Sequence, residues 1–163
     1  MELFNHFSGE LGLLDILVRL LVAVLLGGLV GVERQLNGHW VGLRTLMAVS
    51  MGAAIFTLVG KLAAEQALEL GTNARNIVDA TRVVQGIAAG VGFLGAGAIL
   101  KLSDQLEVKG LTTASAIWLS AALGTAAGLA LWELAVAATL VSLVVLALLR
   151  PVEKWLAKYS RPE

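Results

Sequence analysis

Long runs of apolar residues make up most of the chain, and the charged residues lie between these runs or at their ends. About 20 mostly apolar residues cross the core of a bilayer as a helix. The runs therefore predict five membrane-spanning helices, at residues 11–32, 43–64, 80–100, 110–128 and 131–149. The last two come from a single stretch, Gly110–Leu149, in which Glu133 is the only charge. Gly124, Gly128 and Trp132 mark the turn that we expect inside it.

The composition favours a membrane protein over a soluble enzyme. Hydrophobic residues make up 58% of the chain and charged residues 15%, against about 45–50% and about 25% in soluble domains. The net charge is zero and there are no cysteines, so we expect no nucleic-acid partner, no disulfide and no thiolate metal site. No nucleophile, base and orienting group are grouped as catalysis requires. We predict an all-α, polytopic membrane protein without enzymatic activity and without a resident cofactor.

The distribution of Lys and Arg predicts how the chain is oriented. With five spans, one side of the membrane carries eight basic residues, namely Arg34, Arg44, Lys101, Lys109, Arg150, Lys154, Lys158 and Arg161. The other side carries at most four, namely Arg19, Lys61, Arg75 and Arg82. Since basic loops stay in the cytoplasm, the N-terminus is expected outside and the C-terminus inside. Residues 1–150 form one transmembrane domain in this interpretation, and 151–163 form a short amphipathic cytoplasmic tail.

Two charge pairs lie near the expected outer ends of spans one and three. Asp15 and Arg19 have the i,i+4 spacing of a helical ion pair, and Asp79 and Arg82 have i,i+3 spacing. The four residues could converge as an ion entry site, or form two separate structural pairs. Magnesium sites use uncompensated carboxylates, whereas two Asp and two Arg sum to zero. Asp79 is the one candidate metal ligand, and bound Mg²⁺ is the one cofactor considered.

Three further charges flank the first expected cytoplasmic connector. We expect Glu33 either to pair with Arg44 or to accept from the N–H groups of a neighbouring helix. Arg34 and Arg44 make this region positive, which suits lipid phosphates or another anionic ligand. Simple anchoring of the helix ends at the interface is the alternative.

A short motif recurs where spans two and four begin. Gly42 opens a Gly-Leu-Arg-Thr run that ends at Thr45, and Gly110 opens a Gly-Leu-Thr-Thr run with Thr112 and Thr113. The repetition predicts two related helical hairpins followed by a fifth helix. The threonines could cap the helix starts, or the free N–H groups there could bind an anion.

Glycines at intervals of four predict close helix packing. Gly27 and Gly31 lie on one face of the first span. In the third span Gly86, Gly90 and Gly97 share a face, which we expect to pack inside the bundle or against a second copy. The partners predicted from these features are the lipid bilayer, a second copy in a dimer, and another membrane protein.

The ordered set of motifs resembles the MgtC/SapB family. The set comprises the Gly-x-Glu-Arg and Gly-Leu-Arg-Thr runs around the first connector, the Asp79, Arg82 and Gln85 series, the Gly-Phe-Leu-Gly-Ala-Gly run ending at Gly97, and the Gly-Leu-Thr-Thr-Ala run from Gly110. The resemblance implies a bacterial inner-membrane protein linked to magnesium homeostasis, with possible small-ion transport. It also implies an alternative, because some members are described as modulators of a cation transporter or of the ATP synthase.

The chain departs from the family pattern at three places. Leu46 and Ala80 stand where members often have His and Pro. Longer members carry a C-terminal domain similar to ACT regulatory folds, whereas only a short segment follows Arg150 here. We therefore expect a short form without the regulatory roles of that domain.

Overall fold

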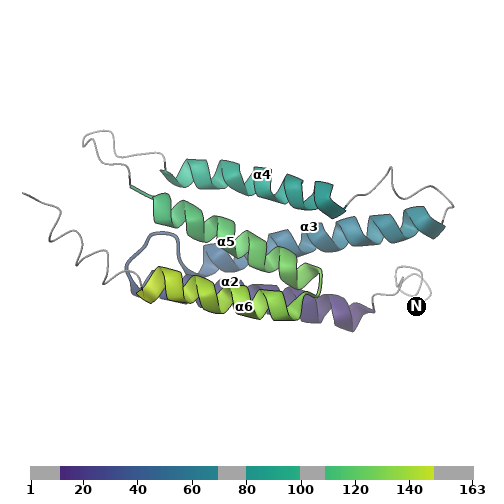
Figure 1. The fold of residues 1–163 in the computed structure, drawn as a ribbon, viewed down its shortest axis with the longest axis horizontal. Coiled ribbons are helices and arrows are strands. Elements are labelled where there is room, and N and C mark those ends of the chain that lie inside the picture. The colour runs from purple at the N-terminus through teal and green to yellow at the C-terminus, as the bar shows by residue number, and fades with distance from the viewer. Residues whose placement is uncertain (1–11, 70–79, 100–108, 149–163) are drawn as a thin grey trace, which may run out of the picture.

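The computed structural model describes residues 12–69, 80–99 and 109–148, and this part of the chain is entirely helical (Figure 1). Its elements are α2 (Leu13–Leu36), α3 (Leu43–Glu69), α4 (Ala80–Ile99), α5 (Leu111–Gly128), α6 (Trp132–Leu143) and the π-helical η2 (Val144–Leu148). A helix satisfies its backbone N–H and C=O groups internally, which a segment surrounded by lipid must do. The expected all-α membrane fold is confirmed.

Three of these helices are long and apolar enough to cross a bilayer by length and composition, namely α2, residues Leu43–Gln66 of α3, and Thr81–Ile99 of α4. The other two are shorter. With 18 residues, α5 extends about 27 Å at 1.5 Å per residue. The apolar helix after it covers Trp132–Ala147.

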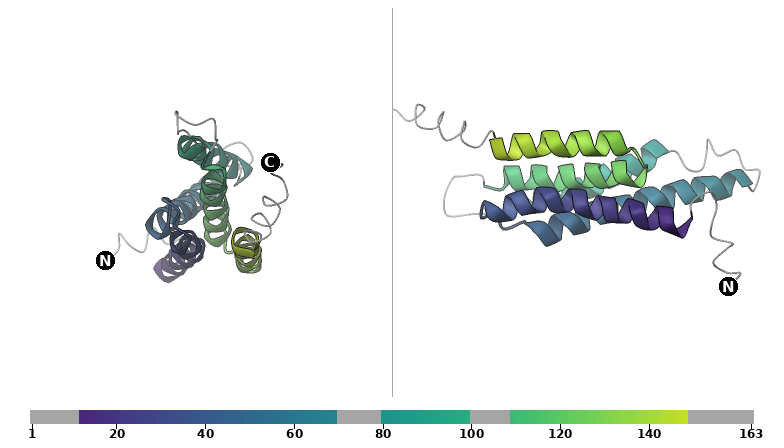
Figure 2. Two further views of the ribbon diagram at one scale, coloured as in Figure 1. Left: turned by 90° about the vertical axis from the view of Figure 1, so that its left-hand side faces the viewer. Right: turned by 90° about the horizontal axis from the view of Figure 1, so that it is seen from below.

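The other helices pack around α5. The α2–α3 and α4–α5 pairs are the two predicted hairpins, and α5 also packs against α2, α3 and α6. Viewed along the bundle, α5 lies between α4 on one side and α2 and α6 on the other (Figure 2). Ser50 approaches Gly124 while Ala54 approaches Gly128, so α3 and α5 run in the same direction, as two related hairpins would require.

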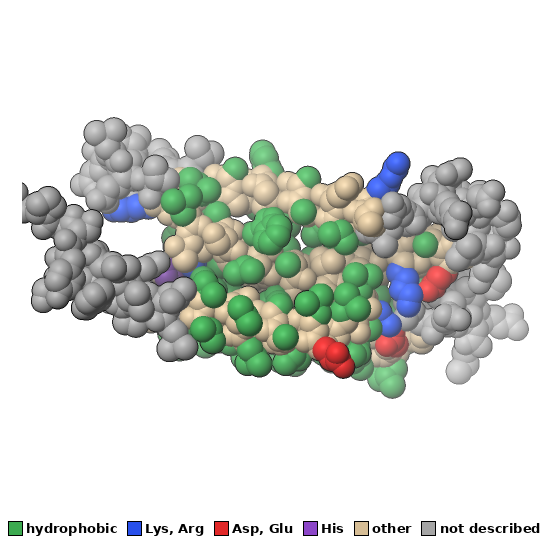
Figure 3. Space-filling model, viewed as in Figure 1, with side chains coloured by type: hydrophobic (Ala, Val, Ile, Leu, Met, Phe, Trp, Pro, Cys, Tyr) green, Lys and Arg blue, Asp and Glu red, His purple; other side chains and the backbone are tan. Residues whose placement is uncertain are grey.

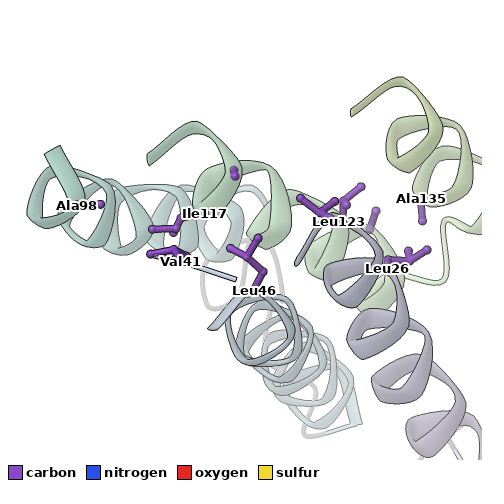
Figure 4. Packing of buried hydrophobic residues seen from close by; sticks show 10 residues of the cluster. Leu26, Val41, Leu46, Ala98, Ile117, Leu123 and Ala135 are labelled. Carbon is purple, nitrogen blue, oxygen red and sulfur yellow. The ribbon is translucent and has the colours of Figure 1, made fainter. Parts of the chain in front are cut away.

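The core consists of small and medium apolar side chains from α2, α3, α4, α5 and α6. Leu26, Leu46 and Leu123 meet where α2, α3 and α5 approach, with Ala135 of α6 beside them (Figure 4). Charged side chains lie mostly toward the ends of the bundle, and hydrophobic ones cover the length between (Figure 3). This distribution matches a bilayer core flanked by two aqueous interfaces.

Glycines allow the backbones of α2, α3 and α5 to approach closely. A Cβ on Gly27 would lie 2.6 Å from the Leu46 carbonyl oxygen, and one on Gly31 would lie 2.6 Å from the Leu43 Cα. Gly124 and Gly128 similarly contact the backbone of α3. The packing predicted for Gly27 and Gly31 is confirmed.

Gly86, Gly90 and Gly97 of α4 are not packed against a neighbouring helix in this way. No heavy atom would lie within 4 Å of a Cβ added at Gly86, Gly90 or Gly97. The expectation that this face packs inside the bundle is wrong for the described residues, because α4 turns a different face toward α5.

The turn between α5 and α6 uses an alanine where a glycine is usual. Ala130 has φ of 57°, the left-handed conformation that glycine adopts at the ends of many helices. The Leu131 N–H donates to the Ala126 carbonyl at 2.9 Å, and the Ala130 N–H donates to that of Ala127 at 3.0 Å. Of the two glycines expected to mark this turn, Gly124 lies within α5, whereas Gly128 is the last residue of α5 and directly precedes the turn.

Candidate functional site

Arg34 is the most deeply buried charge in the described helices. It lies in the last turn of α2 with 0% of its surface exposed. Its Nη2 donates to Thr113 Oγ1 at 2.5 Å, its Nη1 to the Thr112 carbonyl at 3.2 Å, and its Nε to the Val41 carbonyl at 3.4 Å. A buried guanidinium needs such partners because losing hydration is costly. The anchoring of a helix end at the interface, one of the two expectations for this residue, does not describe it.

These contacts change the interpretation of the recurring glycine motif. Gly42 and Gly110 do lie directly before α3 and α5, and Gly110 has φ of 100°, with the Ala98 carbonyl oxygen at the position that a Cβ would need. However, no side chain caps α5, because the Thr113 hydroxyl binds Arg34. The first N–H of α3 is satisfied by Gln35 Oε1 at 3.3 Å. The predicted threonine capping is therefore wrong for Thr113, and both Thr45 and Thr112 have exposed side chains.

Glu33 and Arg44 do not form the expected pair. Glu33 Oε1 accepts a hydrogen bond from Asn37 Nδ2 at 2.6 Å, within the same helix end. Arg44 is exposed in the first turn of α3 and forms no ion pair with any residue that the structure describes. The Glu33–Arg44 pairing is therefore wrong.

Arg19 occupies the equivalent buried position at the opposite end of α2. Only 7% of it is exposed. Its Nε donates to Asp15 Oδ2 at 2.7 Å, as the i,i+4 spacing predicted, and its Nη1 donates to the Gly128 carbonyl at 2.8 Å. Gly128 ends α5, where unpaired carbonyls and the helix dipole favour a positive charge.

The four-residue cluster between spans one and three, one of the two alternatives for these charges, does not form around Arg19. Arg82 is exposed on α4, and α3 and α5 separate α4 from α2 (Figure 2). Asp79 lies outside the described residues. Among those that are described, no group of three or more His, Cys, Asp or Glu side chains could hold a metal ion.

The two arginines together set how α2 and α5 align. Fifteen residues separate Arg19 from Arg34, and fifteen separate Thr113 from Gly128. At 1.5 Å per residue each interval is about 22 Å, so both contacts form in one antiparallel register. We call the two ends of the bundle the Arg34 end, with Arg44 and Lys109, and the Arg19 end, with Lys61 and Arg82.

Buried hydroxyl groups in the interior are mostly turned toward the backbone. Ser50 donates to the Ala23 carbonyl at 2.7 Å and joins α3 to α2. Thr57, Thr125 and Thr139 donate to carbonyls one turn earlier in their own helices. Ser120 Oγ is buried without a hydrogen-bond partner. These groups stabilise the helices and leave few polar atoms facing one another in the core.

The sequence did not predict which hydroxyl and carbonyl groups the two arginines contact. Arg19 and Gly128 are 109 residues apart, and Arg34 and Thr113 are 79 apart. The available signal was an arginine next to an apolar run, which must find a partner in the bundle or reach the interface. This pattern indicates that the arginine needs a partner, but it does not identify the partner.

Known proteins match the chain over most of its length. The sequence model of the MgtC family matches residues 20–155. Protein SrpB of Synechococcus elongatus is 44% identical over 134 residues, which cover 78% of this chain and 71% of SrpB. Putative magnesium transporter YhiD of Escherichia coli K12 is 36% identical, covering 81% of this chain and 59% of YhiD. Protein MgtC of Brucella abortus is 42% identical, covering 79% and 49%.

The chain therefore spans little more than half the length of YhiD and about half that of MgtC. No solved structure matches it. The family match runs from within α2 through α6 and includes Arg34 and both glycine motifs, and it begins one residue after Arg19. This chain belongs to the MgtC family of membrane proteins.

Proposed function

We propose that the chain serves magnesium-linked ion homeostasis in the bacterial inner membrane by docking to another membrane protein, and that it conducts no ion itself. The observation that carries this proposal is the closed interior of α2, α3 and α5. A conducting path needs polar groups or water along its length. Here both buried arginines bind atoms of the chain at opposite ends of α5.

The packing between those ends supports the same interpretation. Leu26, Leu46 and Leu123 fill the space between the helices. The Ser50 hydroxyl in this layer donates its hydrogen bond to the Ala23 carbonyl. Transport of a small ion, the competing function, would require this layer to open.

The outer face of α4 supports docking. We define this face as Gly86, Ala89, Gly90, Phe93 and Gly97, all of which are exposed. The exposed side of α2 carries leucines, including Leu14, Leu21, Leu25 and Leu29. Small residues let another helix approach closely in lipid, so the outer face of α4 suits a protein neighbour better than the leucines of α2 do.

The relatives support the link to magnesium, since one of them is named a putative magnesium transporter. We place the Arg34 end on the cytoplasmic side, with the N-terminus outside and the C-terminus inside. The excess of Lys and Arg in the sequence is the support for this orientation.

Two measurements test the proposal. Proteoliposomes containing the purified chain should show no flux of magnesium, protons or phosphate above that of empty vesicles. Copurification in mild detergent should yield a second membrane protein in fixed ratio, and Gly90→Leu should lose it together with growth at low magnesium. Ala137→Leu, at an exposed position of α6, is the matched control and should keep both. Ion flux through the chain, or recovery of homo-oligomers alone, would contradict the proposal.

A further inference from the structure

An apolar groove runs between α3 and α4. Its volume is about 730 Å³, and its walls include Gly52 and Phe56 of α3 and Gly86, Gly90 and Leu94 of α4. Among the residues that line it, Thr45 is the one with a polar side chain. Phe56 and Leu94 are exposed along its rim, so the groove opens sideways toward the surrounding lipid.

The groove is closed toward the Arg19 end. A Cβ on Gly60 would lie 2.6 Å from Val83 Cγ2, so α3 and α4 touch there. At Gly52 and Gly86 no atom lies within 4 Å of the equivalent position. The two helices therefore diverge from the Gly60–Val83 contact toward the Arg34 end, as their paths in Figure 1 show.

The length of the groove distinguishes between its possible occupants. Fifteen residues separate Thr45 from Gly60, which is about 22 Å along the helix. One leaflet contributes about 15 Å of the roughly 30 Å hydrocarbon core. The groove is longer than one leaflet but shorter than the whole core, so it can hold an acyl chain that enters from the leaflet at its open end. A transmembrane helix would cross the whole core and meet the Gly60–Val83 contact.

Charge at the open end selects the headgroup. Arg44 lies one helical turn before Ala48, which lines the groove, so both are on the same side of α3. Arg44 is exposed and has no ion-pair partner in the described part of the chain. The first turn of α3 adds the positive end of a helix dipole. A basic side chain above an apolar groove matches an amphiphile with a negative head.

We propose that this groove binds one acyl chain of an anionic phospholipid, whose phosphate contacts Arg44 and the Thr45 hydroxyl. The acyl chain lies over Gly52, Gly86 and Gly90, where the missing side chains make room for it. The site belongs to the leaflet at the Arg34 end. Gly86 and Gly90 belong both to the groove and to the outer face of α4, so the lipid site and the proposed docking site overlap there. Gly52 and Arg44 lie on α3 and outside the docking face, so substitutions at these two residues test the lipid site separately from the docking.

Native mass spectrometry of the full chain, released from detergent with added lipid, tests this site. The wild type should retain one phosphatidylglycerol per chain and prefer it over phosphatidylcholine about fivefold, the factor expected of one arginine near an anionic group. Arg44→Gln should remove the preference, and the matched Arg82→Gln at the Arg19 end should keep it. Gly52→Leu should reduce binding of both lipids, whereas Ala137→Leu should not.

Other results would overturn the proposal. Equal retention of the two lipids by the wild type would exclude a headgroup site at Arg44. Full lipid retention by Gly52→Leu, with unchanged circular dichroism, would exclude the groove. A change from dimer to monomer in Gly52→Leu, without lipid loss, would assign the groove to a second copy. Displacement of the lipid by inorganic phosphate alone would assign Arg44 to free phosphate.

Discussion

Replacing Gly27 by alanine should force α2 away from α3. The added Cβ would lie 2.6 Å from both the Leu46 carbonyl oxygen and the Ser50 Cβ, whereas ordinary contact begins at 3.4 Å. The helices must separate locally by the difference, about 0.8 Å, and a gap of about 0.5–1 Å forfeits a quarter to a half of the dispersion attraction across it. The Ser50–Ala23 hydrogen bond of 2.7 Å crosses the same contact. Overpacking of this kind costs about 1–3 kcal/mol of unfolding free energy.

The matched control is Gly52→Ala. No atom lies within 4 Å of the Cβ it would add, so the change should act only through helix propensity and stabilise by about 0.5–1 kcal/mol. Because Gly27→Ala gains the same helix propensity, the two variants should differ by the overpacking cost, about 1–3 kcal/mol. Titration with sodium dodecyl sulfate in mixed micelles, followed by far-ultraviolet circular dichroism, measures this difference. Equal unfolding midpoints for the two variants, or a higher one for Gly27→Ala, would refute the packing argument.

Three further substitutions test the ends of α5. Arg34→Met should cost roughly 2–5 kcal/mol of unfolding free energy, because it removes charged donors from buried acceptors. Arg44→Met at the exposed position should cost little, and similar losses of unfolding free energy in the two variants would argue against the Arg34 contacts. Ala130→Gly should stabilise the fold by about 0.5–1 kcal/mol, since alanine is strained at positive φ; a lower unfolding midpoint would count against it. Asp15→Asn should change stability by less than about 1 kcal/mol, because the Asp15 side chain is 39% exposed and the amide oxygen can still accept from Arg19; a large loss in the same titration would contradict this.

The sequence by itself determined where the helices lie. The expected spans 110–128 and 131–149 correspond to α5 at Leu111–Gly128 and to α6 with η2 at Trp132–Leu148. The glycine motifs at Gly42 and Gly110 likewise precede helix starts. These features are local, because a bilayer requires apolar residues in continuous runs and glycine is favoured where the backbone turns. The family motifs are equally readable along the chain.

The tertiary structure decided which faces meet. Gly27 and Gly86 share the same spacing to a second glycine, yet one is packed against α3 and the other is open. Hydropathy does not distinguish them, because lipid is as apolar as the protein core and the side of a helix facing it looks the same. Arg19 and Arg34 were visible as charges, but their acceptors Gly128 and Thr113 are brought to them only by the antiparallel register of α2 and α5.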